Sequence, residues 1–317
     1  MKRILLIIFL ITSYLLADGK YAGEFISTGT EARSLSLGNI VLTSFNSSSA
    51  SYFNPAYLPL LTNNNVQLSH SERFEGLVRQ EFASFKTKMH GHDLGFSMIW
   101  IGIDNITLTT LQNLDSAISV DNRIIPDKYV NDNEFAFFAS LGKKFNDELF
   151  WGVNVKLLYK TFEEESAFGF GTDISGLYFV DPNITLGMKI QDITTSTLFW
   201  TTGLTEIVRP SLLFNGEYNN RIEYFLLDYK IIAGTKIRTE NYAENSFASL
   251  GVMDFVLSSG VELKFKKIFI RGGYNTDNTW SAGSGLEYKG VTLDYAFKPD
   301  FEDLGNTHKI SLAYSWE

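Results

Sequence analysis

Apolar and polar residues alternate with a period of two from about residue 66 to the end of the chain. This period places successive side chains on opposite faces of a β-strand. In the last segment, residues 307–316, one face carries Ile310, Leu312, Tyr314 and Trp316, and the other carries Lys309, Ser311, Ala313 and Ser315. The pattern recurs so often that an all-β fold is expected.

The alternating segments predict about fourteen strands. Their expected ranges are 66–74, 78–88, 92–101, 133–144, 149–160, 168–179, 183–192, 207–218, 222–233, 257–266, 268–275, 280–288, 291–298 and 307–316. Most have about 8–12 residues, and a tilted strand crosses a bilayer with about 9–11. The lengths therefore suit strands that span a membrane.

The connections between these segments alternate in length. Short joints are expected near 90–91, 146–147, 181–182, 219–220, 266–267 and 289–290. Longer connections are expected at 102–132, 161–167, 193–206, 234–256 and 299–306, and a short one at 276–279. Outer-membrane barrels have short periplasmic turns and long external loops, and an even strand number leaves both chain ends in the periplasm.

The strands of a soluble β-sandwich would show the same alternation, so the position of the aromatic residues is needed to distinguish the two architectures. Aromatic residues lie near the ends of the apolar faces, as in the interfacial girdles of barrels. They are Trp100, Trp151, Tyr159, Tyr274, Trp280, Tyr288 and Trp316. The sequence thus favours an antiparallel transmembrane β-barrel of about fourteen strands, placed in the bacterial outer membrane and surrounded by its lipid.

The chain begins with a pattern typical of a secretory signal peptide. Lys2 and Arg3 precede an apolar run over residues 4–16, and cleavage is expected after Ala17 or Gly19. Residues 20–65 lack sustained alternation and are rich in Ser, Gly, Asn and Ala. We therefore expect a signal peptide at 1–19, an N-terminal plug-like or periplasmic segment at 20–65 and the barrel at 66–317.

Polar residues on the face opposite the apolar one are candidates for the barrel lumen. They are Asn154, Lys156, Lys189, Gln191, Glu262, Lys264, Glu287, Asp294 and Lys309. Charges at membrane depth must be paired or hydrated. These residues would form either a paired polar wall or the lining that sets the selectivity of a pore.

The composition excludes several classes of function. The net charge of −9 offers no basic stripe for nucleic acid. There is no cysteine and no H-E-x-x-H motif, so neither a metal site nor a cofactor is expected. The pair His90 and His92 could hold a metal with a third ligand, but a solvated turn explains it better. We predict that the protein is not an enzyme.

Residues 23–58 resemble the N-terminal block of PorV/PorQ-type outer-membrane proteins, which are related to the FadL-like long-chain fatty acid transporter barrels. The matching features are Phe25, Gly29, residues 32–35, Leu37-Gly38, Ala50-Ser51-Tyr52 and Asn54-Pro55-Ala56. Residues 271–275, 294–298 and 304–316 resemble the closing strands of the family. The resemblance implies a 14-stranded barrel with an N-terminal plug, in which Arg33 and the Asn54-Pro55-Ala56 turn would take part.

The predicted barrel and the family resemblance leave three functions open. A PorV-type relative would serve protein secretion, binding a type IX translocon or its cargo through the external loops. A relative of the fatty acid transporters would instead form a channel for hydrophobic small molecules. A purely structural barrel is the third possibility, because a fold does not fix a function. In each case Tyr314 and Trp316 would present the C-terminal aromatic signal to the barrel-insertion machinery.

Overall fold

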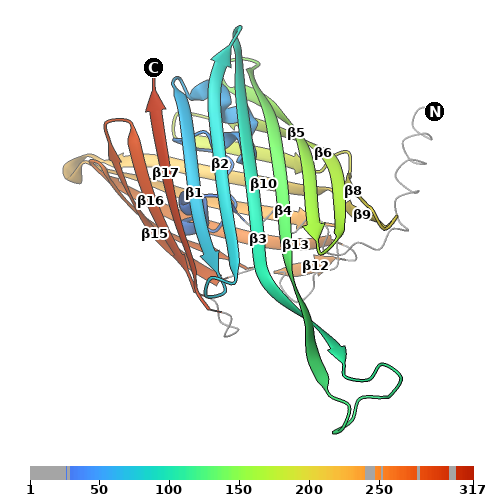
Figure 1. The fold of residues 1–317 in the computed structure, drawn as a ribbon. Helices are drawn as coiled ribbons and strands as arrows, with labels where there is room; N and C mark the ends of the chain where they lie inside the picture. Colours follow the sequence, from blue (N-terminus) through green and yellow to red (C-terminus); the bar gives the residue numbers. More distant parts are fainter. Residues whose placement is uncertain (1–25, 27–28, 240–246, 251–252, 277–278, 300–304) are drawn as a thin grey trace, which may run out of the picture.

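The structure is a computed structural model of the chain, and it describes residue 26 and residues 29–239, 247–250, 253–276, 279–299 and 305–317. Its strands form a closed antiparallel β-barrel with a wall of 14 strands, as the alternation predicted (Figure 1). The predicted signal peptide, residues 1–19, and the first residues of the predicted plug-like segment lie outside the described ranges.

Each wall strand pairs with its neighbours in the chain, and the last pairs with the first. The wall strands are β1 (Asn64–Arg73), β2 (Val78–Met89), β3 (His92–Leu111), β4 (Ile124–Lys144), β5 (Leu149–Phe162), β6 (Glu165–Phe179), β7 (Ile184–Gln191), β10 (Ser211–Ile222), β11 (Leu227–Arg238), β13 (Met253–Phe265), β14 (Ile268–Asn275), β15 (Thr279–Tyr288), β16 (Val291–Lys298) and β17 (Thr307–Trp316). The closing register runs from Asn64 opposite Trp316 to Glu72 opposite His308. Closure leaves no free sheet edge along this seam.

The two ends of the barrel differ in their connections. At one end, here called the turn end, β1 begins and β17 ends, and the connections are 90–91, 145–148, 180–183, 223–226, 266–267 and 289–290. The connections at the opposite loop end are 74–77, 112–123, 163–164, 192–210, 239–252, 276–278 and 299–306. Every turn-end connection has two to four residues. The loop end carries the long connections together with some short ones, and the predicted longer connection at 161–167 was wrong, because it is the two-residue turn 163–164.

The predicted loop at 102–132 is largely strand. β3 continues to Leu111 and β4 begins at Ile124, so the two form a ribbon that projects beyond the barrel, here called the arm (Figure 1). A register shift between Ile103 and Ile106 marks the place where the ribbon leaves the wall. There Asn105 adopts a positive φ of 58°, and its N–H donates to Asn131 Oδ1 at 3.0 Å.

Two predicted strand ranges, 207–218 and 222–233, were wrong by about four residues. The strands begin after Pro210 and end at Arg238, and their joint is the short 3-10 helix η3 (Glu223–Phe225) rather than Asn219-Asn220. Proline cannot donate a ladder hydrogen bond, so it marks the start of β10. Asn220 instead stays in the ladder, opposite Tyr229.

Two other predicted loops also contain strands. Residues 193–206 include β8 (Ser196–Trp200) and the first half of β9 (Thr205–Val208), a hairpin that pairs with β6 beyond the end of β7. Residues 234–256 include β12 (Ala248–Leu250), which pairs with β13. These pieces were missed because they have only 3–5 residues, too few for a periodic pattern to be recognised.

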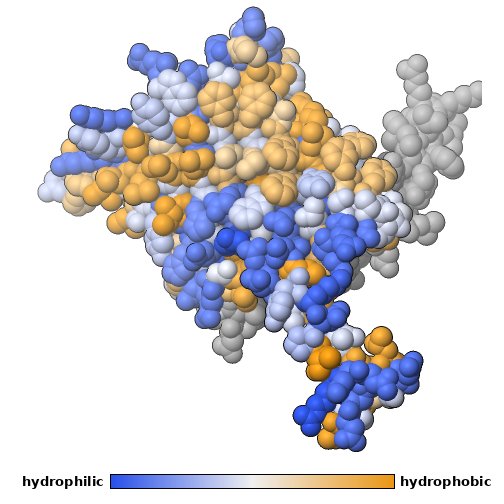
Figure 2. Space-filling model, viewed as in Figure 1, coloured by the Kyte–Doolittle hydropathy of each residue, from blue (hydrophilic) through white to orange (hydrophobic). Residues whose placement is uncertain are grey.

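The polarity of the wall is inverted relative to a soluble protein. Along most of β5 and β17 exposed and buried positions alternate. The exposed positions are mainly apolar, whereas the buried ones include most of the polar side chains, such as Asn154, Lys156 and Lys309. Figure 2 shows the outward apolar residues as a band across the strands nearest the viewer, β1 to β5. An outer apolar band with a polar interior is typical of barrels that sit in lipid.

Residues 29–63, here called the inner segment, lie inside the barrel. They form the helices α2 (Ala32–Ser36) and α3 (Ala50–Phe53) and the 3-10 helix η2 (Pro55–Leu60). α2 packs against β14 to β17, whereas α3 and η2 pack against β2 to β6. Of the helices that the structure describes, none has the length and apolar character needed to cross a bilayer.

Candidate functional site

The lumen wall on one side carries a continuous row of apolar side chains. Cross-strand pairing brings together Phe82, Ile99, Ala136, Leu158, Gly169 and Leu198 on β2 to β6 and β8. Ile101 and Ala167, also buried, extend this row towards the loop end. This surface was not predicted from the sequence, because only polar residues were expected to face the lumen.

The inner segment covers the turn-end side of the apolar row. The Tyr52 ring meets Phe82 and Phe138 in edge contacts, with centroids 6.0 and 5.3 Å apart. Below it, the polar wall contacts the segment through hydrogen bonds, such as that from Ser140 Oγ to the Ser51 carbonyl at 2.9 Å. The segment thus lies between the apolar row and the turn end of the lumen.

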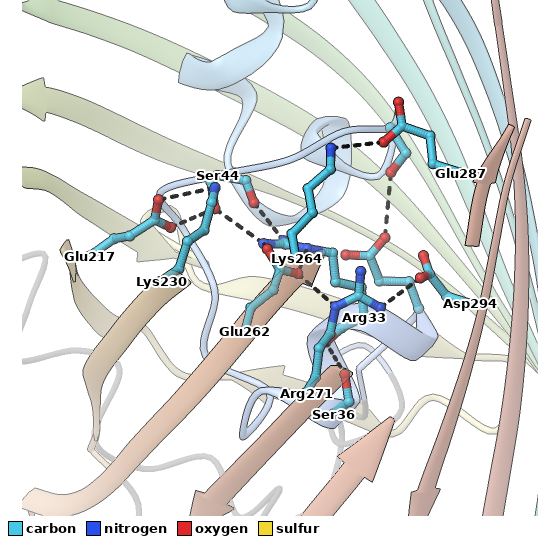
Figure 3. Close-up of polar contacts among 12 residues, drawn as sticks. Arg33, Ser36, Ser44, Glu217, Lys230, Glu262, Lys264, Arg271, Glu287 and Asp294 are labelled. Carbon is cyan, nitrogen blue, oxygen red and sulfur yellow. Dashed lines mark hydrogen bonds and ion pairs between the residues drawn. The ribbon is translucent and has the colours of Figure 1, made fainter. Parts of the chain in front are cut away.

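A first buried charge cluster holds α2 against the side of the wall opposite the apolar row (Figure 3). Arg33 donates from Nε and Nη2 to the two carboxylate oxygens of Glu262, at 2.9 and 3.2 Å. Arg271 donates to Glu262 at 2.6 Å and to Asp294 at 2.6 Å. Two guanidinium groups therefore face two carboxylates, so the buried charges of the cluster balance.

The same cluster fixes the chain that follows α2. Arg33 Nη1 donates to the Ser44 carbonyl at 2.7 Å, and Ser44 Oγ donates to Glu217 at 2.5 Å. Glu217 also pairs with Lys230 at 3.3 Å. Earlier in the segment, burial raises the pKa of the Glu31 carboxyl, although Gln67 donates to it at 2.9 Å.

A second buried charge cluster lies beneath the apolar row. Lys156 Nζ is 2.8 Å from Asp173 and 2.5 Å from Asp192. Lys189 is 3.2 Å from Asp173 and donates to the Tyr52 carbonyl at 2.8 Å. The hydroxyl of Ser196 donates to Asp192. This cluster joins β5, β6 and β7 to the inner segment and to the first residue of β8.

The Asn54-Pro55-Ala56 turn begins η2. Asn54 Oδ1 accepts the N–H of Ala56 at 3.1 Å, an N-cap, while Asn54 Nδ2 donates to the Leu42 carbonyl at 2.6 Å. Pro55 occupies the first helical position, where a missing N–H costs nothing. Asn54 thus ties two parts of the inner segment together, which is a structural role.

Close approach of the inner segment depends on inward-facing glycines. A Cβ on Gly273 would lie 2.3 Å from the Gly38 nitrogen, whereas one on the neighbouring Gly272 would have nothing within 4 Å. Gly152 is similar, because a Cβ there would lie 2.4 Å from the Ala56 nitrogen. The wall therefore has no room for a side chain where the segment touches it.

Gly273→Val is expected to displace the inner segment from β14 and to lower the free energy of unfolding by about 1–3 kcal/mol, the usual cost of overpacking. Gly272→Val adds the same side chain on the outer face and is the matched control. Thermal unfolding in detergent and limited proteolysis of the segment measure the two effects. Equal unfolding temperatures and equal proteolysis rates for the two variants would contradict the close packing of the segment against Gly273.

The predicted lumen residues differ in position. Asn154, Lys156, Lys189, Glu262, Asp294 and Lys309 are buried. Gln191 is half-buried at the end of β7, and Lys264 and Glu287 pair at 3.0 Å near the turn end with partly exposed side chains. Arg271, Asp173, Asp192 and Glu217 were missed, although all four lie within predicted strands.

The remaining candidates lie at the margins of the barrel. Tyr314 and Trp316 stack with centroids 5.7 Å apart at the turn end of β17. His92 starts β3, and His90 belongs to the preceding turn. In the described part of the chain, no group of three or more His, Asp or Glu side chains is arranged to hold a metal ion.

Solved structures with the same architecture include two toluene transporters and a FadL homologue. The Pseudomonas putida toluene transporter TodX is 12% identical, over 90% of this chain and 98% of its own, with a TM-score of 0.60. The chain has the fold of these transporters. The Ralstonia pickettii toluene transporter TbuX is 10% identical over 92% and 99% of the two chains, with a TM-score of 0.59.

A Pseudomonas aeruginosa FadL homologue is also 10% identical, over 92% of this chain and 100% of its own, with a TM-score of 0.56. At these identities the likeness concerns the fold alone. No protein-family model matches the sequence, and no curated protein matches it either. The resemblance to FadL-like barrels is thus confirmed at the level of fold, whereas that to PorV/PorQ-type proteins is not confirmed.

Proposed function

We propose that the protein is a non-enzymatic outer-membrane channel for hydrophobic small molecules. The observation that carries the proposal is the apolar row on the lumen side of β2 to β6 and β8, which strand register places at one height inside the barrel. Ligand sites for such molecules are mostly apolar with a few polar groups nearby. Neighbours described as toluene transporters and as a FadL homologue support this substrate class.

The orientation in the membrane follows from the connections. In bacterial barrels the short turns face the periplasm. We place the turn end there, with both ends of the wall, and the loop end and arm outside the cell. The predicted signal peptide would direct the chain to this compartment, and the outward apolar band of Figure 2 would sit in the lipid.

In this proposal the inner segment acts as the plug. It occupies the turn-end half of the lumen, beneath the apolar row, and both buried charge clusters anchor it to the wall. A hydrophobic ligand entering from the loop end would meet the apolar row and the rings of Tyr52 and Phe53 before the two charge clusters that anchor the segment. Passage would then require the segment to move, and Arg33 would be the anchor that resists it.

Ile99→Asn is expected to lower uptake of a hydrophobic ligand about tenfold or more, because a polar amide in an apolar site costs about 1–3 kcal/mol. Uptake of a radiolabelled monoaromatic hydrocarbon and of a long-chain fatty acid is measured in cells that lack other such channels. Thr292→Asn, on the charged side of the lumen, is the control. Unchanged uptake by folded Ile99→Asn protein would contradict the proposed route.

A second candidate is the secretion-accessory role, favoured by the arm. Its exposed apolar residues are Leu114, Ile118, Val120, Ile124 and Tyr129. An isolated two-stranded ribbon is marginal in water, so a protein contact would stabilise it. Co-purification from native membranes in mild detergent distinguishes the two roles. Stoichiometric translocon subunits or cargo would favour secretion, whereas bound apolar molecules without a protein partner would favour the channel.

A further inference from the structure

A hollow of about 500 Å³ lies on the outer face of the wall, across β1 to β5. Its sides are Phe85, Phe96, Met98, Phe137 and Leu157, and its floor includes Ala83 and Ala139. Register places Phe85, Phe96 and Ala139 in one row across three strands, and Met98 and Phe137 in the next. Small residues between large ones therefore make a groove in the apolar band that Figure 2 shows.

A lysine–histidine pair lies in line with this groove at the turn end. His92 and Lys143 alternate in phase with Phe96 and Ala139, so their side chains leave the same outer face. Lys143 Nζ contacts His92 Nδ1 at 2.5 Å, and Lys143 pairs across strands with Trp151. Lys143 lies four residues from Ala139 along β4, which is about 13 Å at the rise of a strand.

The environment of Lys143 suits an anion. Among the ion pairs of the described residues it has no carboxylate partner, whereas its neighbour Lys144 pairs with Asp147 at 2.5 Å. If Lys143 donates one hydrogen to the His92 nitrogen, its ammonium group has two more to donate. Lysine is a common ligand of phosphate groups. Trp151 beside it is a residue type enriched where membrane meets water.

We propose that this surface binds one glycerophospholipid from the surrounding leaflet, with an acyl chain in the groove and the phosphate at Lys143 and His92. The proposal rests on the membrane location of the proposed function but not on channel activity. The spacing, the apolar groove and the unpaired cation are what a lipid with an anionic headgroup requires. A lipid held there would cover the outer side of β2 to β5, the strands whose inner side carries the apolar row.

Native mass spectrometry of delipidated protein, titrated with dioleoyl phosphatidylglycerol, tests the site. The wild-type protein is expected to retain one lipid. Ala139→Leu, which fills the groove, and Lys143→Gln, which removes the charge, are each expected to lower retention at least fivefold. Ala233→Leu on the outer face of β11 and Lys289→Gln at another turn-end connection are the matched controls and are expected to retain it.

Three outcomes would overturn the proposal, and each would point to a different cause. If Ala139→Leu and Lys143→Gln both retain as much lipid as the wild-type protein, the lipid binds elsewhere or only as bulk solvent. Equal binding of a dioleoyl diacylglycerol, which lacks the phosphate, would remove the role of Lys143 and His92. Displacement of the lipid by a monoaromatic hydrocarbon would assign the groove to the channel substrate. Ligand uptake in the same variants is measured separately, so failure of the lipid site and failure of the channel remain distinguishable.

Discussion

Replacing Arg33 with methionine is expected to lower the free energy of unfolding by about 3 kcal/mol, the lower part of the range for breaking a buried ion pair. The variant removes two hydrogen bonds to Glu262 and one to the Ser44 carbonyl. Glu262 keeps Arg271 as a partner, which limits the loss. Since Arg33 is the main charged anchor of α2, the inner segment should also leave its position more often, and the conductance of the barrel should rise.

Thermal unfolding in detergent and single-channel recording in planar bilayers measure these two effects. Arg33→Lys retains the charge but cannot make the two-pronged contact with Glu262, so an intermediate result is expected. Lys264→Gln breaks a partly exposed pair with Glu287 and should change little. Wild-type conductance and stability in Arg33→Met would show that the segment is held by other contacts.

Lys156→Met is expected to cost about 3–5 kcal/mol, because it leaves the buried carboxylate of Asp192 without a cation. Asp173 would keep Lys189, at 3.2 Å, but Asp192 would keep only hydroxyl contacts such as that from Ser196. Ser196 begins the β8–β9 hairpin, which completes the wall beyond the end of β7. The hairpin should therefore detach from β6, and Leu198 with it.

Hydrogen exchange at residues 196–208 and unfolding temperature report this change. The double variant Lys156→Met, Asp192→Asn removes the uncompensated charge and is expected to recover part of the loss. Lys144→Met, whose partner Asp147 is fully exposed, serves as the control and should behave as wild type. A double variant no better than Lys156→Met would mean that packing, rather than charge, explains the effect.

The wall could be predicted from the sequence because each strand carries its own pattern. The alternation in residues 150–160 corresponds to β5, and that in 307–316 to β17, without reference to any other part of the chain. The ends of strands were less predictable where pairing partners decide them. β3 extends to Leu111 only because residues 124–130 are there to pair with it, and Asn220 remains in a strand despite its turn propensity.

The buried clusters could be predicted only in part, because their members come from distant segments. Lys156, Glu262 and Asp294 were recognisable as polar positions on an inward face. Their partners were not, since strand register decides that Lys156 lies beside Asp173, and the path of the inner segment decides that Arg33 reaches Glu262. The apolar row was missed because an inward-facing Ile99 or Leu158 breaks the rule that only outward residues of a barrel are apolar.

The contacts of the inner segment also constrain how the barrel can be assembled. Arg33 and Glu262 are 229 residues apart in the chain, and Gly29 and Lys309 are 280 apart. The N–H of Ala32 donates to Ser311, while Ser69 bonds the same residue across the seam between β1 and β17. The inner segment, although it precedes every wall strand in the chain, must therefore wait for the last strand before its binding surface exists. Contacts of such long range slow folding, so closing the seam and docking the segment should occur as one late step.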